Sequence, residues 1–103
     1  MLFRAGRSLG ECGLISAAVH YWTQTVTDAT DALGPDHPDT LTTRHHLARW
    51  RGEAGDPAGA VAAFDGLLGD YLRVLGADHP DTLIVQSNLA YWRGRAHDQG
   101  ELR

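Results

Sequence analysis

The chain has 103 residues, of which 43% are hydrophobic and 21% are charged, and its formal net charge is −4. This length fits a single domain with a modest core, and the acidic balance argues against a nucleic-acid-binding protein, which usually carries an excess of basic residues. Cys12 is the only cysteine, so no intrachain disulfide can form and a cytoplasmic location is the simplest expectation.

The first two helices are predicted near residues 2–11 and 14–33. The stretch from Cys12 to Thr27 carries no formal charge, but it is too short and too polar to span a bilayer. The N-terminal MLFRAGRSLG lacks the continuous apolar core of a signal peptide. Apolar residues recur every three or four positions in the second helix, as a buried helix face requires. They are Ile15, Ala18, Val19, Trp22, Val26, Ala29 and Leu33.

A connector follows with the sequence GPDHPDTL (residues 34–41), and it returns 42 positions later as GADHPDTL (residues 76–83). Its glycine follows the last periodic leucine and suits a left-handed helix end. Its proline suits the first turn of the next helix. Asp36 and Asp78 are predicted to cap those helices by accepting hydrogen bonds from free backbone N–H groups. We therefore interpret DHPD as a structural motif and not as a metal or catalytic site.

Three further helices are predicted near residues 37–54, 57–75 and 79–97. Between the first two, Gly55-Asp56-Pro57 repeats the same order of helix end, cap and first-turn proline. Apolar positions again recur with helical spacing, and no segment shows the alternation of a strand. The expected core includes Trp22, Leu47, Phe64, Leu67 and Leu89.

The repeat sets the expected architecture. The chain contains about two and a half copies of one unit, at about residues 1–33, 34–75 and a truncated 76–103. A period of this length is typical of a solenoid, in which each unit buries its apolar face on its neighbours. The fold class is therefore predicted to be all-α, as one domain over residues 1–103 with five helices.

Leu47-Ala48, Gly55, Ala60 and Phe64 have the spacing that resembles the tetratricopeptide repeat. The 42-residue period and the LGPDHPDTL connector resemble more specifically the kinesin-light-chain-like subtype, which also occurs in bacterial regulatory proteins. This resemblance implies a right-handed superhelix of helix pairs. It also implies that the first helix of each pair lines a concave groove that takes peptides or protein segments. Arg51 and Arg93 depart from the family, which often has an aromatic residue at this position.

The expected ligand is acidic. Most differences between the two copies of the unit fall on the first helix of the pair, as on a binding surface, although drift of exposed positions is the alternative. Arginines gather on the first helices and aspartates on the second, and guanidinium groups bind carboxylates or phosphates in a bidentate manner. The candidate groove residues are Arg4, Arg7, His45, His46, Arg49, Asn88, Tyr91 and Arg95. For Arg51 and Arg93, pairing with a neighbouring Asp or Glu is the favoured alternative.

Enzymatic activity is not predicted. The neighbouring His45 and His46 would point about 100° apart on a helix and cannot comfortably share a metal ion. The sequence contains no HExxH, CxxC or Gly-x-Ser-x-Gly motif. We therefore expect no catalytic residue, no metal ion and no cofactor, and we expect a protein that neither spans a membrane nor binds nucleic acid.

Self-association is the second function class. The last predicted helix lacks a following helix of the kind that residues 58–75 provide for the unit before it. An open end of a solenoid exposes apolar surface meant for a neighbour. Leu89 and Trp92 are therefore predicted to meet a second copy, most simply in a two-fold homodimer. The alternative is that a folded-back tail or the missing part of a parent protein covers them.

Overall fold

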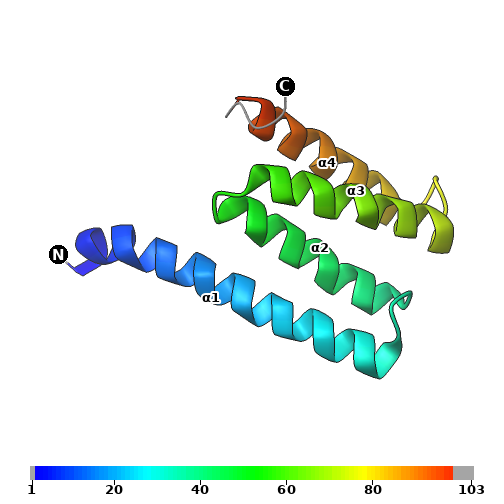
Figure 1. Cartoon of the computed structure of the whole chain (residues 1–103), viewed down its shortest axis with the longest axis horizontal. Helices are drawn as coiled ribbons and strands as arrows, with labels where there is room; N and C mark the ends of the chain where they lie inside the picture. The colour runs from blue at the N-terminus through cyan, green and yellow to red at the C-terminus, as the bar shows by residue number, and fades with distance from the viewer. Residues whose placement is uncertain (1, 99–103) are drawn as a thin grey trace.

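The computed structural model describes the backbone of residues 2–98 and the side chains of residues 13–98. Four α-helices make up this part: α1 (Leu2–Leu33), α2 (Pro38–Glu53), α3 (Pro57–Val74) and α4 (Pro80–Asp98). Short turns join them, so successive helices run in opposite directions and each packs on the one before it (Figure 1). Residues 2–98 contain no strand, and the all-α prediction is confirmed.

The prediction of five helices is wrong, because residues 2–33 form one continuous helix. The turn expected at Gly13 is not made. Gly34, Gly55 and Gly76 have φ of 92°, 100° and 90°, whereas Gly13 does not have a positive φ. Gly13 is followed by Leu14-Ile15, where the α2–α3 turn has Asp56-Pro57. Without a capping carboxylate and a proline, nothing interrupts the helical hydrogen bonds.

Two of the predicted caps are wrong. Helix α2 begins at Pro38, so the residue in the capping position is His37, whose Nδ1 accepts a hydrogen bond from the N–H of Asp39 at 3.1 Å. Asp36 lies one residue too early and binds Arg73 of α3 instead, at 2.8 Å.

The second connector repeats this cap. Nδ1 of His79 accepts from the N–H of Asp81 at 3.0 Å, so His79 takes the role predicted for Asp78. The third predicted cap is confirmed, since the Asp56 carboxylate accepts from the N–H of Gly59 at 2.9 Å. The glycine helix ends at Gly34 and Gly76 are confirmed as well.

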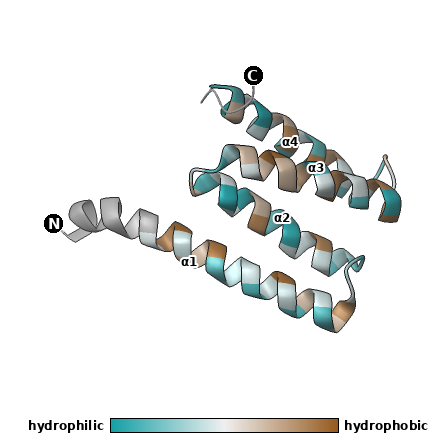
Figure 2. Ribbon diagram, viewed as in Figure 1, coloured by the Kyte–Doolittle hydropathy of each residue, from teal (hydrophilic) through white to brown (hydrophobic). Residues whose placement is uncertain are grey.

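The core is centred on α3, which packs against both α2 and α4 and carries hydrophobic residues along much of its length (Figure 2). Phe64, Leu67 and Leu89 are buried as predicted. Trp22 and Leu47 are only partly buried. These two lie in the α1–α2 layer, at the edge of the array, where fewer helices surround a side chain. The buried hydrophobic residues are Leu41, Ala48, Ala60, Phe64, Leu67, Tyr71, Val85, Leu89, Trp92 and Ala96.

The predicted dimer interface at Leu89 and Trp92 is wrong, because both side chains are buried inside the chain. They belong to the face that α4 turns toward the preceding unit. The face that α4 would turn toward a following helix carries Leu83 and Ala90, the counterparts of the buried Leu41 and Ala48, and both are exposed. The prediction assigned the apolar residues of α4 to the wrong one of its two faces.

Candidate functional site

Two neighbouring pockets lie between α2 and α4, the first helices of the second and third units. The first has a volume of about 190 Å³, and we name it the histidine pocket. It is lined by Thr42, His45, His46, Tyr71, Asp81 and Ile84. The second has a volume of about 350 Å³, and we name it the arginine pocket. It is lined by Arg49, Glu53, Ser87, Asn88, Tyr91 and Trp92.

Helical spacing explains why α2 contributes to both pockets. Thr42, His45, His46, Arg49 and Glu53 follow one another at intervals of three or four residues, apart from the adjacent histidines, so they share one face of the helix. The opposite wall is a similar face of α4, and Tyr71 of α3 contributes to the histidine pocket. Both pockets lie along the same two helices, and we refer to them together as the groove along α2 and α4.

The histidine pocket is built on stacked rings. The ring of His45 meets the buried ring of Phe64 edge-on, with 5.2 Å between centroids, and His46 stacks on Trp22 at 4.5 Å. Burial lowers the pKa of His45, and the nearby His46 and Arg49 lower it further. Burial and Arg49 also lower the pKa of His46. Both imidazoles are therefore mainly neutral near pH 7.

Tyr71 keeps its proton as well, because burial raises the pKa of its phenol. Apart from the Asp81 carboxylate, the described lining of the histidine pocket is thus uncharged near pH 7. Its rings and Ile84 can accommodate a small apolar side chain.

The arginine pocket is charged. The Arg49 guanidinium lies 5.3 Å from the centroid of the Trp50 ring. Nη1 of Arg95 donates a hydrogen bond to the Tyr91 hydroxyl at 2.6 Å, and the same guanidinium lies 5.3 Å from the Trp92 ring. Within the described side chains, no carboxylate lies within ion-pair distance of Arg49 or Arg95. The carboxylate of Glu53, one turn from Arg49, lines the same pocket.

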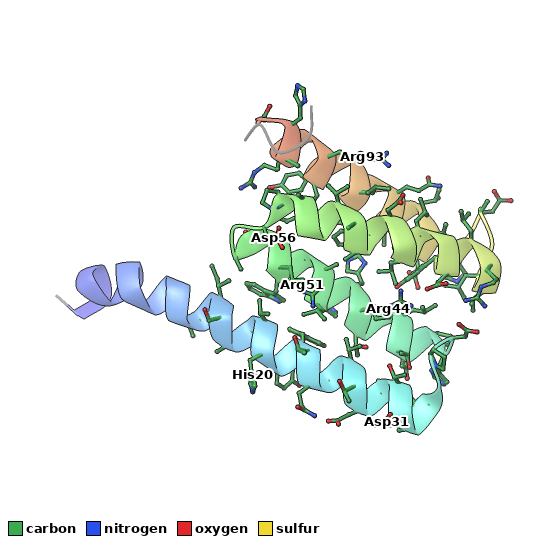
Figure 3. All side chains as sticks on the ribbon, in the orientation of Figure 1. His20, Asp31, Arg44, Arg51, Asp56 and Arg93 are labelled. Atoms are coloured by element: carbon green, nitrogen blue, oxygen red, sulfur yellow. The ribbon has the colours of Figure 1, made fainter. Side chains whose placement is uncertain are left out.

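Several arginines elsewhere on the array are paired with carboxylates, among them Arg44, which is labelled in Figure 3. Arg44 binds Asp70 across α2 and α3 at 2.7 Å. Arg73 binds Asp36 at 2.8 Å and Asp70 at 3.0 Å. These pairs lower the pKa values of both aspartates, chiefly through the arginine hydrogen bonds. These two arginines thus hold helices together and have their charges compensated.

The two arginines that depart from the family pattern differ from one another. Arg93 lies 3.7 Å from Asp65, so the pairing alternative is confirmed for it. Arg51 is exposed, lines neither pocket, and has no carboxylate within ion-pair distance in the described part of the chain.

The structure brings together most of the predicted groove residues. His45 and His46 line the histidine pocket, while Arg49, Asn88 and Tyr91 line the arginine pocket. Arg95 borders the arginine pocket through its contacts with Tyr91 and Trp92. The predicted Arg4 and Arg7 lie outside the residues whose side chains the structure describes.

Other lining residues were missed. Thr42, Ile84, Ser87 and Glu53 occupy positions at which the two copies of the unit differ, so the same comparison of copies could have identified them. Asp81 repeats Asp39 unchanged, and Tyr71 lies on α3, so neither gave such a signal.

Comparison with known proteins identifies the family. The family model described as the tetratricopeptide repeat matches residues 5–39 and 40–81, which together cover most of the chain. The chain belongs to the tetratricopeptide repeat family. The comparison with curated proteins and the comparison with solved structures each found no match. Tetratricopeptide repeats are protein-interaction modules, and the groove along α2 and α4 lies on the first helices of their pairs.

No helix in the described part of this tetratricopeptide array is long and apolar enough to cross a membrane. Within the described residues, His, Cys, Asp and Glu side chains do not gather in threes at a spacing that would hold a metal ion.

Proposed function

We propose that this tetratricopeptide repeat domain binds an acidic peptide or protein segment in the groove between α2 and α4. The observation that carries the proposal is a division among the arginines. Arg44 and Arg73 are compensated by aspartates, whereas Arg49 in the arginine pocket and Arg95 beside it have no carboxylate partner among the described side chains. A guanidinium that has no carboxylate partner keeps N–H donors that can bind a carboxylate or phosphate of a ligand.

The neighbouring groups suit a peptide main chain. Nδ2 of Asn88 donates one hydrogen bond to the carbonyl oxygen of Ile84 at 2.9 Å. Its amide oxygen and its second N–H remain for a ligand, since an asparagine amide has two donors and an acceptor. The Ser87 hydroxyl lines the same pocket. An acidic side chain at Arg49 would therefore lie beside groups that can hold the adjoining backbone.

The histidine pocket adds a second requirement. Because its described lining is largely ring surface and neutral imidazole, it favours a small apolar side chain. We propose a ligand with an acidic residue and an apolar residue close together in sequence, which would occupy the arginine and histidine pockets respectively.

Fluorescence polarisation with a panel of labelled acidic, basic and apolar peptides tests this function. Acidic peptides with an apolar neighbour should bind best. Arg49→Glu should weaken their binding by roughly 1–3 kcal/mol, as the loss of a hydrogen bond between charged groups does. Arg51→Glu is the matched control, because it makes the same charge change outside both pockets, and its effect should be much smaller. Equal binding of basic peptides, or equal effects of the two variants, would contradict the proposal.

The 42-residue period and the connector support a finer assignment to the kinesin-light-chain-like subtype, and to a regulatory setting in bacteria, as part of the same proposal. A module of this kind would act in the cytoplasm as part of a larger regulatory protein. A pull-down from the native host with wild type and Arg49→Glu in parallel would identify partners that depend on the groove.

A further inference from the structure

The second and third units show how one first helix packs on the unit before it. In α4, Val85, Leu89, Trp92 and Ala96 are all buried. The Trp92 ring covers Gly52 of α2, the first helix of the preceding unit, while α4 as a whole packs along α3, the second helix of that unit. A complete seat for a first helix therefore has two walls, one from each helix of the preceding unit.

The corresponding seat for α2 has only one wall. Trp50 and Ala54 are the counterparts of Trp92 and Ala96 at the 42-residue period, but Trp50 is only partly buried and Ala54 is exposed. The counterpart of Gly52 is Gly10, which lies in the N-terminal part of α1. A cleft of about 290 Å³ lies at this end of α2, lined by Ile15, Ser16, Glu53 and Ala54.

The face of α1 that corresponds to the buried face of α3 is also incompletely covered. Ala60, Phe64 and Leu67 of α3 are fully or almost fully buried. Their counterparts in α1 are Ala18, Trp22 and Thr25, and all three are only partly buried. In α3 this face is covered by α2 on one side and α4 on the other, whereas the extensive packing of α1 within residues 2–98 is against α2.

Residues that could form the second wall are present in the sequence, but they do not fold back onto their own chain. The tetratricopeptide match begins at residue 5, so residues 5–12 correspond to a first helix, yet they continue α1 without a turn. At 1.5 Å per residue, α1 is about 48 Å long and α2 about 24 Å. Helix α2 can therefore cover only about half of α1, and α1 continues past the α2–α3 turn (Figure 1).

We infer that two copies of this chain exchange the N-terminal parts of their α1 helices. In this dimer the two α1 helices run antiparallel and cross near Gly13, so that residues 2–12 of each copy supply the missing wall of the other. The arrangement is two-fold and closed, since each copy gives and receives the same segment. The straight helix at Gly13 favours a second copy as the occupant, because residues 2–12 of the same chain could reach the seat only through a turn.

The exchange would also complete the groove, a consequence that rests on the proposed function. Arg7 and Arg4 occupy the register positions of Arg49 and His46 in the repeat. In the dimer they would therefore extend the row of first-helix positions past α2, with two further basic residues supplied by the second copy. The dimer itself does not depend on the ligand. An experiment that finds no dimer would therefore contradict the exchange alone, and one that finds no binding of acidic peptides would contradict the proposed function.

Cross-linking tests which copy supplies the wall. Arg44 and Asp70 are in contact across α2 and α3, and their counterparts one unit earlier are Leu2 and Asp28. The variant Leu2→Cys/Asp28→Cys, with Cys12→Ala, is treated with a short bismaleimide reagent at low protein concentration and weighed by mass spectrometry. The exchange predicts a product of twice the chain mass that carries the 2–28 link. A 2–28 link within single chains, or no 2–28 link, would overturn the inference.

A second experiment tests whether the absence of a turn at Gly13 causes the exchange. Leu14→Asp/Ile15→Pro gives α1 the Asp-Pro pair of the α2–α3 turn and should let residues 2–12 return to their own chain, so that a dimeric wild type becomes a monomer with similar helix content. Gly13→Ala is the opposite control, because alanine should favour the straight helix about fivefold per copy and tighten the dimer. Light scattering across a dilution series measures the oligomeric state of wild type and of both variants. A wild type that is monomeric at high concentration, or a dimer that neither variant changes, would refute the exchange.

Discussion

The indole ring of Trp92 in α4 lies so close to Gly52 in α2 that a β-carbon on Gly52 would be 2.5 Å from Cη2 of the ring. Trp92 is 1% exposed and also lines the arginine pocket. The contact thus joins two successive first helices of the array and sets the distance between the two walls of the groove. The fold and the proposed binding site depend on the same pair of residues.

Gly52→Ala should destabilise the protein. An alanine in place of a glycine inside a helix normally gains about 0.8–1.0 kcal/mol, but here the added carbon meets a buried ring that cannot easily move. Overpacking of this kind costs about 1–3 kcal/mol, so we expect a net loss of up to about 2 kcal/mol in the free energy of unfolding. Urea denaturation followed by circular dichroism measures it.

Gly69→Ala is the control for this prediction. Gly69 is an exposed glycine of α3 with nothing within 4 Å of an added β-carbon. The same substitution there should stabilise the protein by about 0.5–1 kcal/mol. If both variants shifted the unfolding midpoint in the same direction, the close packing of Gly52 against Trp92 would be disproved.

Much of the fold was predictable because the chain repeats itself. The connector, its glycines and the Gly55-Asp56-Pro57 turn are local signals, and each marks a helix end where the structure has one. The buried positions of Phe64 and Leu67 follow from helical spacing. Most of the groove residues followed from comparing the two copies, since the scaffold positions stay constant while the pocket positions change.

The errors arose where the type or spacing of a residue did not by itself determine its role. Leu89 and Trp92 are apolar and helical in spacing, but spacing alone does not say which of two neighbouring helices a face meets. Gly13 occupies the position of Gly55 and suggested a turn, but the residues after it decide whether that turn forms. Asp36 is a good capping residue by type and still loses this role, because His37 occupies the capping position and Arg73, remote in sequence, binds the carboxylate.

The imidazole caps give a second prediction. His37→Ala removes the acceptor for the N–H of Asp39, and loss of a capping side chain costs about 0.5–2 kcal/mol, so the unfolding midpoint should fall. His37→Asn should retain most of the stability, since asparagine is among the best capping residues. Thermal melts of the two variants and of wild type provide the comparison. A loss as large in His37→Asn as in His37→Ala would indicate a role other than capping.

Glu53 gives a third prediction, which concerns ligand choice. Its carboxylate lines the arginine pocket one turn from Arg49 and should repel an acidic group bound there. Glu53→Gln keeps the shape and removes the charge, so acidic peptides should bind more tightly, by up to about 1 kcal/mol, as for exposed charge pairs. Titrations at low and high salt provide the check, because the gain should shrink as salt screens the charges. Weaker binding in Glu53→Gln would mean that the carboxylate itself contacts the ligand.

The last prediction concerns pH. The pKa of His45 in the folded protein is below its ordinary value of 6.5, chiefly because of burial, with His46 and Arg49 acting in the same direction and Asp81 against them. The pKa of His46 is lowered as well. The unfolded chain therefore binds more protons than the folded chain just below pH 6.5, and stability should fall as the pH drops through that value.

This pH window is separate from that of the aspartates. The pKa values of Asp36 and Asp70 are lowered by their arginine partners from 3.8, so their contribution is present above pH 3.8 and is lost only in stronger acid. We expect the free energy of unfolding to decrease between pH 7.5 and pH 5, where the aspartates stay ionised. His45→Gln should flatten this decrease, even though it lowers stability at every pH through the lost ring contact with Phe64. Urea titrations at several pH values measure the slope, and His20→Gln, a change at an exposed histidine of α1, serves as the control. A slope in His45→Gln equal to that of wild type would show that His45 does not account for the loss.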